Sequence, residues 1–262
     1  MKTALTIAGS DCGGGAGIQA DLKTFSAHGV FGMSVITSVV AENTFRVIEY
    51  QDVRPDMIAK QIDAVFEDIV PASVKIGMLS NRETMLIVAD KLKEYKPANV
   101  VIDPVMYAKN GSALMNPEAI ETLISEIVPL ADLITPNIPE AEKMAGIKIE
   151  TREDMKKAAK IIREMGCRAA LVKGGHSAGD AADILYDGSE FYSFTARRID
   201  TKNTHGTGCT FSSAIAANLA LGLTLEKTVE MAKEYVTEAI RHALPLGKGN
   251  GPTNHFYKFF DN

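Results

Sequence analysis

The residues best suited to chemistry lie between positions 203 and 212, where two glycines open a run of small residues typical of a helix. Gly206 and Gly208 carry no side chain, so an anion can approach the unpaired amides and partial positive charge of a helix start. Cys209 falls in the same turn, where a proton acceptor or a nucleophile would face that anion. The segment predicts an anion site, although a plain glycine turn with a buried thiol is an alternative.

A second glycine-rich segment, residues 9–17, follows an apolar run and precedes a helical pattern, which is the order of a ligand-binding turn. It is not a Walker A loop, because Gly15 stands where the lysine belongs. It is not a dinucleotide fingerprint either, because Ile18 replaces the third glycine. We expect a closely packed loop beside a small polar ligand, with Asp11 and Asp21 as hydrogen-bonding candidates. A helix cap or a solvated helix face is the alternative for either aspartate.

Composition limits the classes of protein that this chain can represent. Its 262 residues are 46% hydrophobic and fit one large α/β domain spanning 1–262, with no linker or internal repeat. A net charge of −5 without a basic stripe argues against nucleic acid and against a membrane anchor. No apolar stretch reaches the roughly 20 residues of a membrane span, and Cys12, Cys167 and Cys209 form no Cys-x-x-Cys pair. We expect a cytoplasmic protein with reduced thiols.

Short apolar runs alternate with helical patterns along the chain. The predicted strands are residues 4–8, 34–41, 74–78, 100–103, 133–135 and 170–173. The predicted helices are residues 56–69, 82–94, 117–127, 138–145 and 152–165. Continuous apolar strands separated by helices indicate an α/β fold with a mostly parallel, doubly wound sheet that is covered on both faces.

Local signals add detail to this fold. Ser80 followed by Glu83, and Thr151 followed by Asp154, each predict a capping box at a helix start. Residues 184–192 place Asp-Gly between alternating runs and predict an antiparallel hairpin at one edge of the sheet. The glycine- and proline-containing tail after position 244 could fold over a site.

Polar side chains follow several of the predicted strands, where ligands of doubly wound sheets bind. Lys173 precedes two glycines and suits a phosphate contact. Asp103, Asn137 and Glu140 offer oxygen ligands suited to Mg²⁺, mostly through water. Asn137 and Glu140 could also form only a capped helix start, and Lys173 a solvated strand end. Their common position at one sheet edge favours a site.

The combined motifs resemble hydroxymethylpyrimidine/phosphomethylpyrimidine kinases, a family of the ribokinase-like superfamily in thiamine biosynthesis. The resemblance runs from position 4 to about 255 and is carried by residues 4–11, 13–24, 75–78, 135–137, 173–176 and 203–209. It implies a three-layer αβα sandwich with a mostly parallel central sheet and an antiparallel edge hairpin. It also implies transfer of the γ-phosphoryl group of ATP, with Mg²⁺, to a hydroxymethyl aminopyrimidine and then to its monophosphate. Relatives are often dimers, so a homodimer is among the expected states.

The resemblance assigns roles at the phosphoryl-transfer end of the site. The backbone of Gly206, Thr207 and Gly208 would hold the migrating phosphoryl group, and Lys173 would contact the nucleotide phosphates together with Asn137. Asp103 and Glu140 would hold Mg²⁺ through water. Cys209 stands where related sugar kinases carry an aspartate base and is the candidate proton acceptor. A helix start would lower its pKa, whereas nearby phosphates would raise it.

The residues expected to contact the acceptor substrate are Gly9, Ala16, Asp21, Glu42, Met78 and Val105. Related pyrimidine kinases commonly have Gln where this chain has Glu42, and an ionised carboxylate can only accept hydrogen bonds. Glu42 could still pair with an aminopyrimidine if either the ring or the carboxyl group were protonated. This departure leaves pyridoxal or pyridoxine open as the substrate.

Two other classes of function are considered. His205, four residues before Cys209, could form a Cys–His nucleophile pair in a thiol enzyme. A non-catalytic pyrimidine-binding protein would lack the phosphate-binding residues that this chain retains. Met33, Met78 and Met106 could line an aromatic pocket. Residues 225–242 and the tail near Gly247 are positional candidates for the adenine site.

Overall fold

The computed structural model describes residues 1–107, 115, 117–175 and 181–260. Within this part of the chain, the main sheet has eight strands in the order β10-β9-β8-β7-β6-β5-β1-β2. Its strands are β1 Thr3–Ala8, β2 Phe31–Ile36, β5 Ser73–Ile76, β6 Val100–Ile102, β7 Leu133–Ile134, β8 Ala169–Val172, β9 Ala181–Tyr186 and β10 Phe191–Ala196. In this sheet the neighbouring strands β2, β1, β5, β6, β7 and β8 pair in parallel. The pairs β8–β9 and β9–β10 are antiparallel. The predicted mostly parallel sheet and edge hairpin are confirmed.

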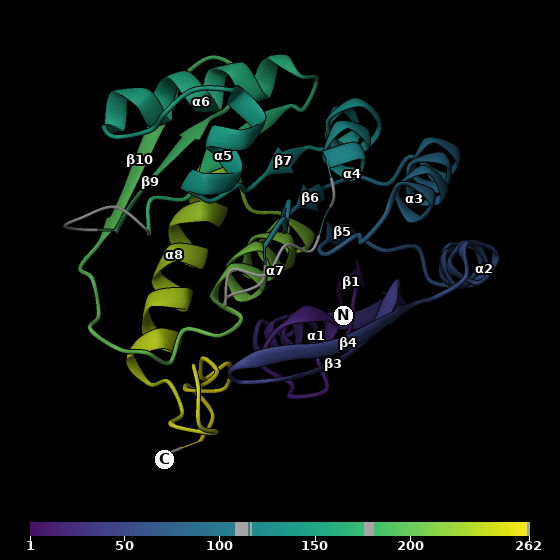
Figure 1. Ribbon diagram of the computed structural model, residues 1–262, viewed down its shortest axis with the longest axis horizontal. Helices are drawn as coiled ribbons and strands as arrows, with labels where there is room; N and C mark the ends of the chain where they lie inside the picture. Colours follow the sequence, from purple (N-terminus) through teal and green to yellow (C-terminus); the bar gives the residue numbers. More distant parts are fainter. Residues whose placement is uncertain (108–114, 116, 176–180, 261–262) are drawn as a thin grey trace.

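Helices cover both faces of this sheet (Figure 1). They are α1 Gly17–Ala27, α2 Pro55–Phe66, α3 Arg82–Tyr95, α4 Pro117–Thr122, α5 Ile138–Ala145, α6 Arg152–Glu164, α7 Thr207–Ala220 and α8 Leu225–Arg241. A π-helical turn, Leu123–Ile127, and a 3₁₀ turn, Val128–Leu130, continue α4. One buried cluster joins the sheet to α2 through α6, and a second joins it to α1, α7 and α8. The fold is therefore the three-layer sandwich that was predicted.

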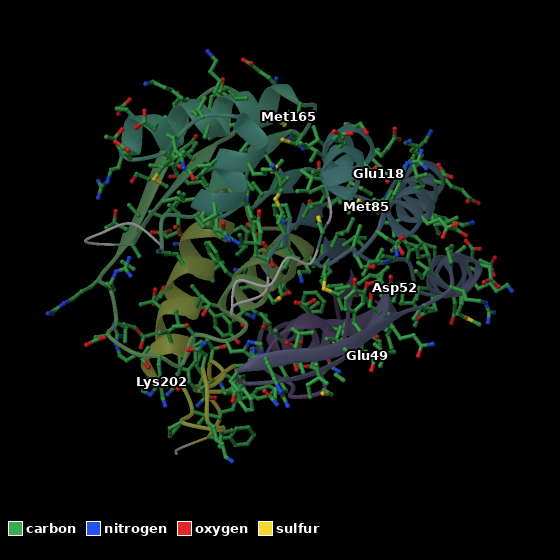
Figure 2. All side chains as sticks on the ribbon, in the orientation of Figure 1. Glu49, Asp52, Met85, Glu118, Met165 and Lys202 are labelled. Atoms are coloured by element: carbon green, nitrogen blue, oxygen red, sulfur yellow. The ribbon has the colours of Figure 1, made fainter. Side chains whose placement is uncertain are left out.

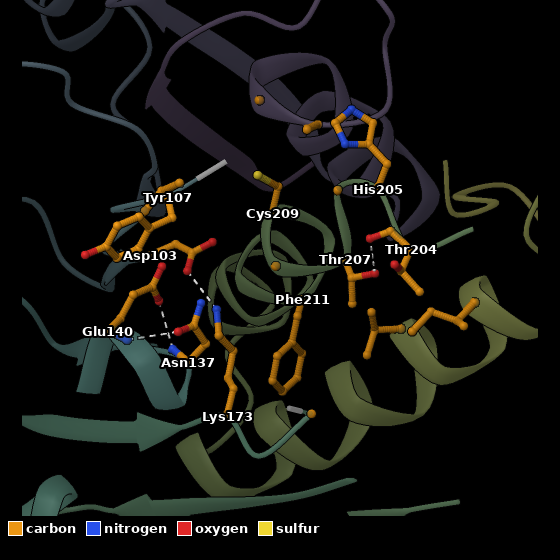
Figure 3. Close-up of a pocket in the computed structure, with 18 of the residues that line it drawn as sticks. Asp103, Tyr107, Asn137, Glu140, Lys173, Thr204, His205, Thr207, Cys209 and Phe211 are labelled. Atoms are coloured by element: carbon orange, nitrogen blue, oxygen red, sulfur yellow. Dashed lines mark hydrogen bonds and ion pairs between the residues drawn. The ribbon is translucent and has the colours of Figure 1, made fainter. Parts of the chain in front are cut away.

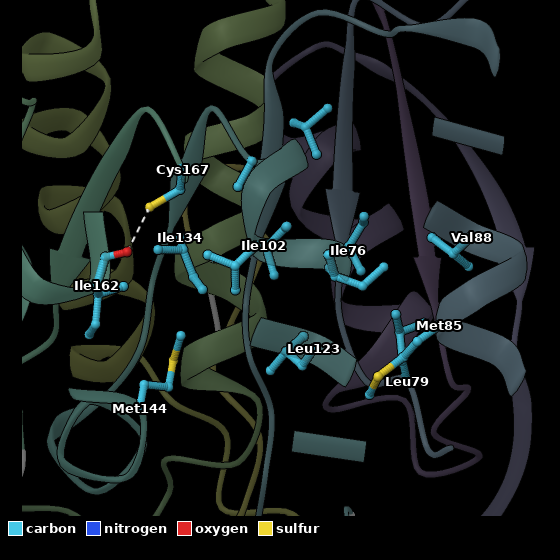
Figure 4. Packing of buried hydrophobic residues seen from close by; sticks show 14 of the residues in the cluster. Ile76, Leu79, Met85, Val88, Ile102, Leu123, Ile134, Met144, Ile162 and Cys167 are labelled. Atoms are coloured by element: carbon cyan, nitrogen blue, oxygen red, sulfur yellow. Dashed lines mark hydrogen bonds between the residues drawn. The ribbon is translucent and has the colours of Figure 1, made fainter. Parts of the chain in front are cut away.

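The larger core cluster shows why the short central strands are mostly apolar in sequence. Ile76, Ile102 and Ile134 project from neighbouring strands β5, β6 and β7 into one face of the sheet, and all are fully buried (Figure 4). Met85 and Leu123 pack against this row from the helical layer. Strands buried on both faces have no polar side to alternate with, so their edge is where polar side chains can reach a ligand.

One predicted strand, residues 34–41, is wrong as a single element. The chain leaves the main sheet after β2 and starts β3, Ser38–Asn43, which pairs with β4, Arg46–Asp52, in a separate antiparallel hairpin. The break lies at Thr37, whose amide donates to Ala8 in the main sheet, while Ser38 already pairs with Asp52. The hairpin β3–β4 lies beside β1 and α1 and reaches the C-terminal tail (Figure 1).

Asp52, labelled in Figure 2, explains a second correction. Its carboxylate accepts hydrogen bonds from Ser38 (2.6 Å), Ser80 (2.6 Å) and Asn81 (2.7 Å). Ser80 therefore joins the hairpin to the start of α3 and forms no capping box with Glu83, and the helix cap is Asn81, which accepts from the Thr84 amide.

The second predicted capping box is confirmed at the start of α6. The Thr151 hydroxyl accepts from the Asp154 amide, and the Asp154 carboxylate accepts from the Thr151 amide. None of the helices in the described ranges combines the length and the apolar character that crossing a bilayer requires.

Candidate active site

A cavity of about 920 Å³ opens at the carboxyl ends of the parallel strands, above the start of α7 (Figure 3). This position is where doubly wound sheets bind ligands. The predicted site residues that line it are Gly9, Ala16, Glu42, Met78, Asp103, Val105, Asn137, Glu140, Lys173, Gly206, Thr207, Gly208 and Cys209. Residues from both glycine loops, from the hairpin β3–β4 and from the ends of strands β5, β6, β7 and β8 thus surround one space.

The two glycine loops meet backbone to backbone. Gly206 caps α7 with a φ of 76°, and a Cβ there would collide with the Gly15 carbonyl group. A Cβ on Gly208 would lie 3.4 Å from Asp103 Oδ2 and 3.6 Å from Lys173 Nζ. The amides of Gly208 and Cys209 precede the first intrahelical bond, which the Thr210 amide donates to Gly206, so they have no acceptor within the helix. Glycine at these positions leaves the start of α7 open to an anion next to Lys173.

Thr207 closes this turn. Its amide and its hydroxyl group donate to the carbonyl oxygen of Thr204, at 3.3 and 2.8 Å. Thr207 still lines the cavity, but its hydroxyl group already has a hydrogen-bond acceptor in the chain. These two contacts stabilise the conformation of the turn.

Lys173 follows β8 and points into the cavity with its ammonium 2.8 Å from Asp103 Oδ1 (Figure 3). Both side chains are largely buried, at 13% and 3% exposed. Burial alone would lower the pKa of Lys173, but the carboxylates of Asp103 and Glu140 outweigh burial and raise it. Lys173 is thus a fixed positive charge beside the start of α7. His176, at the end of the same motif, lies outside the described residues.

Asn137 and Glu140 form a capping box at the start of α5 while they line the cavity. Glu140 accepts from the Asn137 amide at 2.8 Å and from the Met106 amide at 3.4 Å. Burial raises the pKa of Glu140 to about 7, and Asp103 adds to the increase, whereas Lys173 opposes it. Asn137 and Glu140 therefore cap a helix and also face the cavity, so the geometry is compatible with both interpretations.

The carboxyl groups of Asp103 and Glu140 are suited to a hydrated divalent cation. Asp103 already accepts from Lys173 and from the Thr135 and Ser212 hydroxyl groups, and Glu140 from two amides. Few of their lone pairs remain for direct coordination, and Mg²⁺ readily keeps several of its waters. The donor set thus fits contact through water, in the form that the sequence predicted.

Cys209 is half-buried in the first turn of α7, and its thiol faces the cavity. Burial raises the pKa of this thiol to about 11, an increase that Lys75 reduces and Asp21 reinforces. The expected lowering by the helix start does not prevail. The free protein therefore holds Cys209 as a neutral thiol at neutral pH, which is unsuited to a Cys–His nucleophile pair.

Asp21 does not line the cavity, which corrects its prediction as a substrate contact. Its side chain is fully buried, and both of its oxygens accept from Lys75 Nζ, at 3.0 and 2.9 Å. The hydroxyl groups of Thr6 and Ser213 also donate to it, each at 2.6 Å. Asp21 therefore joins α1 to β1, β5 and α7 beneath the site. A Cβ on Gly77 would lie 2.7 Å from Lys75 Nζ, so that glycine makes room for the ammonium.

Asp11, the aspartate of the first glycine loop, contacts Ala16 and His205, both of which line the cavity. Asp11 is 1% exposed and accepts from the Gly13, Gly15 and Ala16 amides and from His205 Nε2, at 2.7 to 2.9 Å. His205 is thus bound to Asp11. Ligand atoms of Asp11, His205 and Glu42 lie within 4.8 Å of one another. This cluster, which we call the rim cluster, joins both glycine loops to the hairpin β3–β4.

The two ends of the cavity differ in character. Met78, Val105 and Glu42 line the end next to the first glycine loop, and a Cβ on Gly9 would lie 2.7 Å from the Met78 side chain. Phe211, Val236 and Ile240 line an apolar region between α7 and α8. The predicted place of Met33 and Met106 in the pocket is wrong, because both pack in the core.

The positional candidates for the adenine site separate in the structure. Helix α8 lines the cavity, whereas Gly247 packs against Thr44 of the hairpin β3–β4. The amides of Gly249 and Asn250 also donate to Thr44, at 3.0 and 2.8 Å. The tail therefore braces the hairpin. Sequence reasoning missed Lys75, and a lysine inside a buried apolar strand was the available signal.

Fold and site together define a small-molecule kinase of the ribokinase-like class. The structure resembles the ADP complex of Bacillus subtilis pyridoxal kinase with a TM-score of 0.91 and 40% identity, covering 97% of each chain. The chain belongs to the phosphomethylpyrimidine kinase family, whose profile matches residues 11–254.

Two curated relatives carry names of the same family. The hydroxymethylpyrimidine/phosphomethylpyrimidine kinase of Rhizobium meliloti is 49% identical over 261 residues, covering 98% of each chain. The thiamine biosynthesis bifunctional protein ThiED of Geobacter sulfurreducens is 52% identical over 252 residues. That match covers 96% of this chain and 51% of the relative, so this chain spans about half of that protein.

Proposed function

We propose that the protein phosphorylates 4-amino-5-hydroxymethyl-2-methylpyrimidine with ATP, and then its monophosphate to the diphosphate, in thiamine biosynthesis. The observation that carries the proposal is the start of α7, whose Gly208 backbone faces Lys173 and Asp103 inside a cavity with two differently lined ends. Phosphoryl transfer needs two ligands in line, with positive charge and backbone donors at the point of transfer. This arrangement, together with the family membership, supports a kinase.

The described residues support a division of roles. The amides at Gly206 and Gly208 would hold the migrating phosphoryl group, and Lys173 would contact the nucleotide phosphates beside Asn137. The substrate hydroxyl oxygen forms the new bond to the γ-phosphorus as the bond to the ADP oxygen breaks. Cys209 can accept the hydroxyl proton only as a thiolate, a form that the nearby Lys75 ammonium favours, and it becomes a neutral thiol as it takes the proton up. The thiol of the free protein would therefore have to lose its proton to solvent before transfer. Bound Mg²⁺, held through water by Asp103 and Glu140, would neutralise phosphate charge.

The acceptor would occupy the end of the cavity formed by Gly9, Ala16, Glu42, Met78 and Val105. The nucleotide base would occupy the apolar region next to α8. A pyridoxal or pyridoxine kinase is the second candidate, because pyridoxal kinases are among the structural neighbours. The pyrimidine is preferred because the full-length relatives at about half identity are named pyrimidine kinases.

An ADP-release assay at saturating ATP and Mg²⁺ tests this proposal. We expect the aminopyrimidine and its monophosphate to give higher kcat/KM values than pyridoxal. Lys173→Met should lower kcat by roughly 10²-fold, as loss of one preorganised charge does. The matched control Lys148→Met, at an exposed lysine, should leave kcat unchanged. An equal or higher kcat/KM for pyridoxal would replace the pyrimidine by the second candidate, and no ADP release with any acceptor would reject kinase activity.

A further inference from the structure

The conformation of strand β3 directs Glu42 into the cavity. Side chains alternate along β3, so Val40 and Glu42 share a face and both line the cavity. The register with β4 shifts between Ala41 and Glu42, where Ile48 is the extra residue of a bulge on β4. The Glu42 backbone is fastened to the first glycine loop, because its carbonyl group accepts from the Cys12 thiol at 3.1 Å and its amide donates to the same sulfur at 3.4 Å. The carboxyl group itself makes no hydrogen bond to the described residues. Glu42 is thus held in place with a free head group.

The titratable groups near the Glu42 carboxyl group differ in their distance from it and in the sign of their effect. Asp11 and His205 face it from the two glycine loops, with ligand atoms within 4.8 Å, and Cys12 contacts its backbone. On the partner strand, Arg46 and Glu49 are exposed to solvent. The charged groups that act on Glu42 are therefore Asp11, which opposes its ionisation, and His205, which favours it.

Asp11 and Glu42 form a pair of carboxyl groups with different environments. Burial alone would raise the pKa of Asp11, but hydrogen bonds from His205 and from backbone amides outweigh burial and lower it. Burial raises the pKa of Glu42 to about 7, and the charge of Asp11 contributes to the increase. Two close carboxyl groups whose environments separate them in this way keep one proton between them, on the less stabilised group. In this pair that group is Glu42.

We propose that burial keeps Glu42 neutral for reading the aminopyrimidine, and that Asp11, anchored by the loop amides and by His205, is a positioning residue that reinforces this neutral state. A carboxylic acid offers one O–H donor beside one carbonyl acceptor. A 4-aminopyrimidine presents a ring nitrogen acceptor beside an amine donor, so the two edges match. A carboxylate would instead face the ring nitrogen with a lone pair. The inference rests on the proposed function and adds how the substrate is recognised.

The test compares the pH dependence of KM for the unphosphorylated aminopyrimidine in the wild type and in Glu42→Gln. Gln keeps one donor and one acceptor without titrating. The wild-type KM should rise about tenfold from pH 6 to pH 8, because the neutral fraction of a group titrating near pH 7 falls by that factor. Glu42→Gln should match the wild type at pH 6 within about threefold and stay level. The control Glu49→Gln, on the same hairpin, should keep the wild-type profile.

Calorimetry of the wild type provides a second measurement that needs no variant. Binding of the aminopyrimidine at pH 8, in two buffers of different ionisation enthalpy, should show uptake of about one proton, since Glu42 must regain it. A wild-type KM that stays level, or binding without proton uptake, would overturn the inference. So would a Glu42→Gln KM raised tenfold at every pH, because that result indicates a carboxylate paired with a protonated ring. Failure of both proteins to phosphorylate the pyrimidine at any pH would reject the proposed function, and the inference with it.

Discussion

Two aspartates that are almost equally buried have different effects on their surroundings. Asp21 is 0% exposed and Asp11 is 1% exposed, and both belong to the segment that follows β1. Asp21 shares its charge with the ammonium of Lys75, which contacts both of its oxygens. Asp11 is satisfied mainly by neutral amides, and its ring partner His205 leaves enough negative charge to act on Glu42.

The difference shows that the type of partner decides what a buried charge does to its neighbours. A carboxylate paired with a lysine is close to neutral as a unit and serves to join elements, here α1, β5 and α7. A carboxylate that is stabilised by amide dipoles keeps its net charge and can change the proton affinity of a neighbouring group. The first arrangement lies beneath the start of α7, and the second lies next to the first glycine loop.

The largest expected effect on stability comes from breaking the ion pair of Asp21 and Lys75, which we call the closed pair. Lys75→Met removes the ammonium and leaves Asp21 buried without a counter-charge, so we expect a loss of about 3 to 5 kcal/mol in the free energy of unfolding. Urea unfolding measures this loss. The double variant Lys75→Met/Asp21→Asn should recover a large part of it, because a neutral amide can accept from one of the Thr6 and Ser213 hydroxyl groups and donate to the other. A single variant as stable as the wild type would show that the pair does not hold these elements together.

A smaller effect is expected at Cys209, the thiol that lies close enough to the closed pair for both of its charges to act on it. Cys209→Ala should lower kcat by roughly 10²-fold, because it removes the sulfur that, as a thiolate, accepts the substrate proton, with KM for ATP unchanged. The matched control is Cys167→Ala, because Cys167 is also a thiol but is buried in the core outside the cavity. Near-normal turnover of Cys209→Ala at saturating substrates would eliminate the proton-acceptor role and leave the α7 amides and Lys173 as the catalytic groups.

The sequence predicts best those features that depend on local pattern. The apolar runs around Ile76 and Ile102 identify buried parallel strands, and Thr151 followed by Asp154 identifies a helix start. The cavity residues that follow strands were also found, because parallel strands bring their carboxyl ends to one edge. Asp103 and Lys173, 70 positions apart in the chain, meet for this reason.

Features that depend on a distant partner were not predictable in the same way. The run from 34 to 41 is mostly apolar apart from Ser34, Thr37 and Ser38, and the pairing of Ser38 with Asp52 divides it between two sheets. Asp21 was assigned to the substrate because nothing local indicates that Lys75, 54 positions away, would bind it. The sequence shows that a charge is present, whereas its partner is decided by the packing of α1 on the sheet.

The smallest expected effect is the pH dependence of stability that Glu42 of the rim cluster causes in the absence of substrate. The pKa of Glu42 is raised from 4.5 to about 7 in the folded protein, so between these values the folded state binds more protons than the unfolded state. Stability should therefore fall as pH rises through this window, and Glu42→Gln should remove that part of the fall.

The difference between Glu42→Gln and the wild type should grow from pH 4.5 to pH 7 and then stay constant. We expect it to reach roughly 2 to 4 °C in Tm, or about 1 kcal/mol after allowance for solvent screening of a partly exposed carboxyl group. Thermal unfolding followed by circular dichroism measures it, with Glu49→Gln as the exposed control. A difference of the same size at every pH would mean that Glu42 affects stability through packing alone, and the charge of Asp11 would then have no measurable influence on its neighbour.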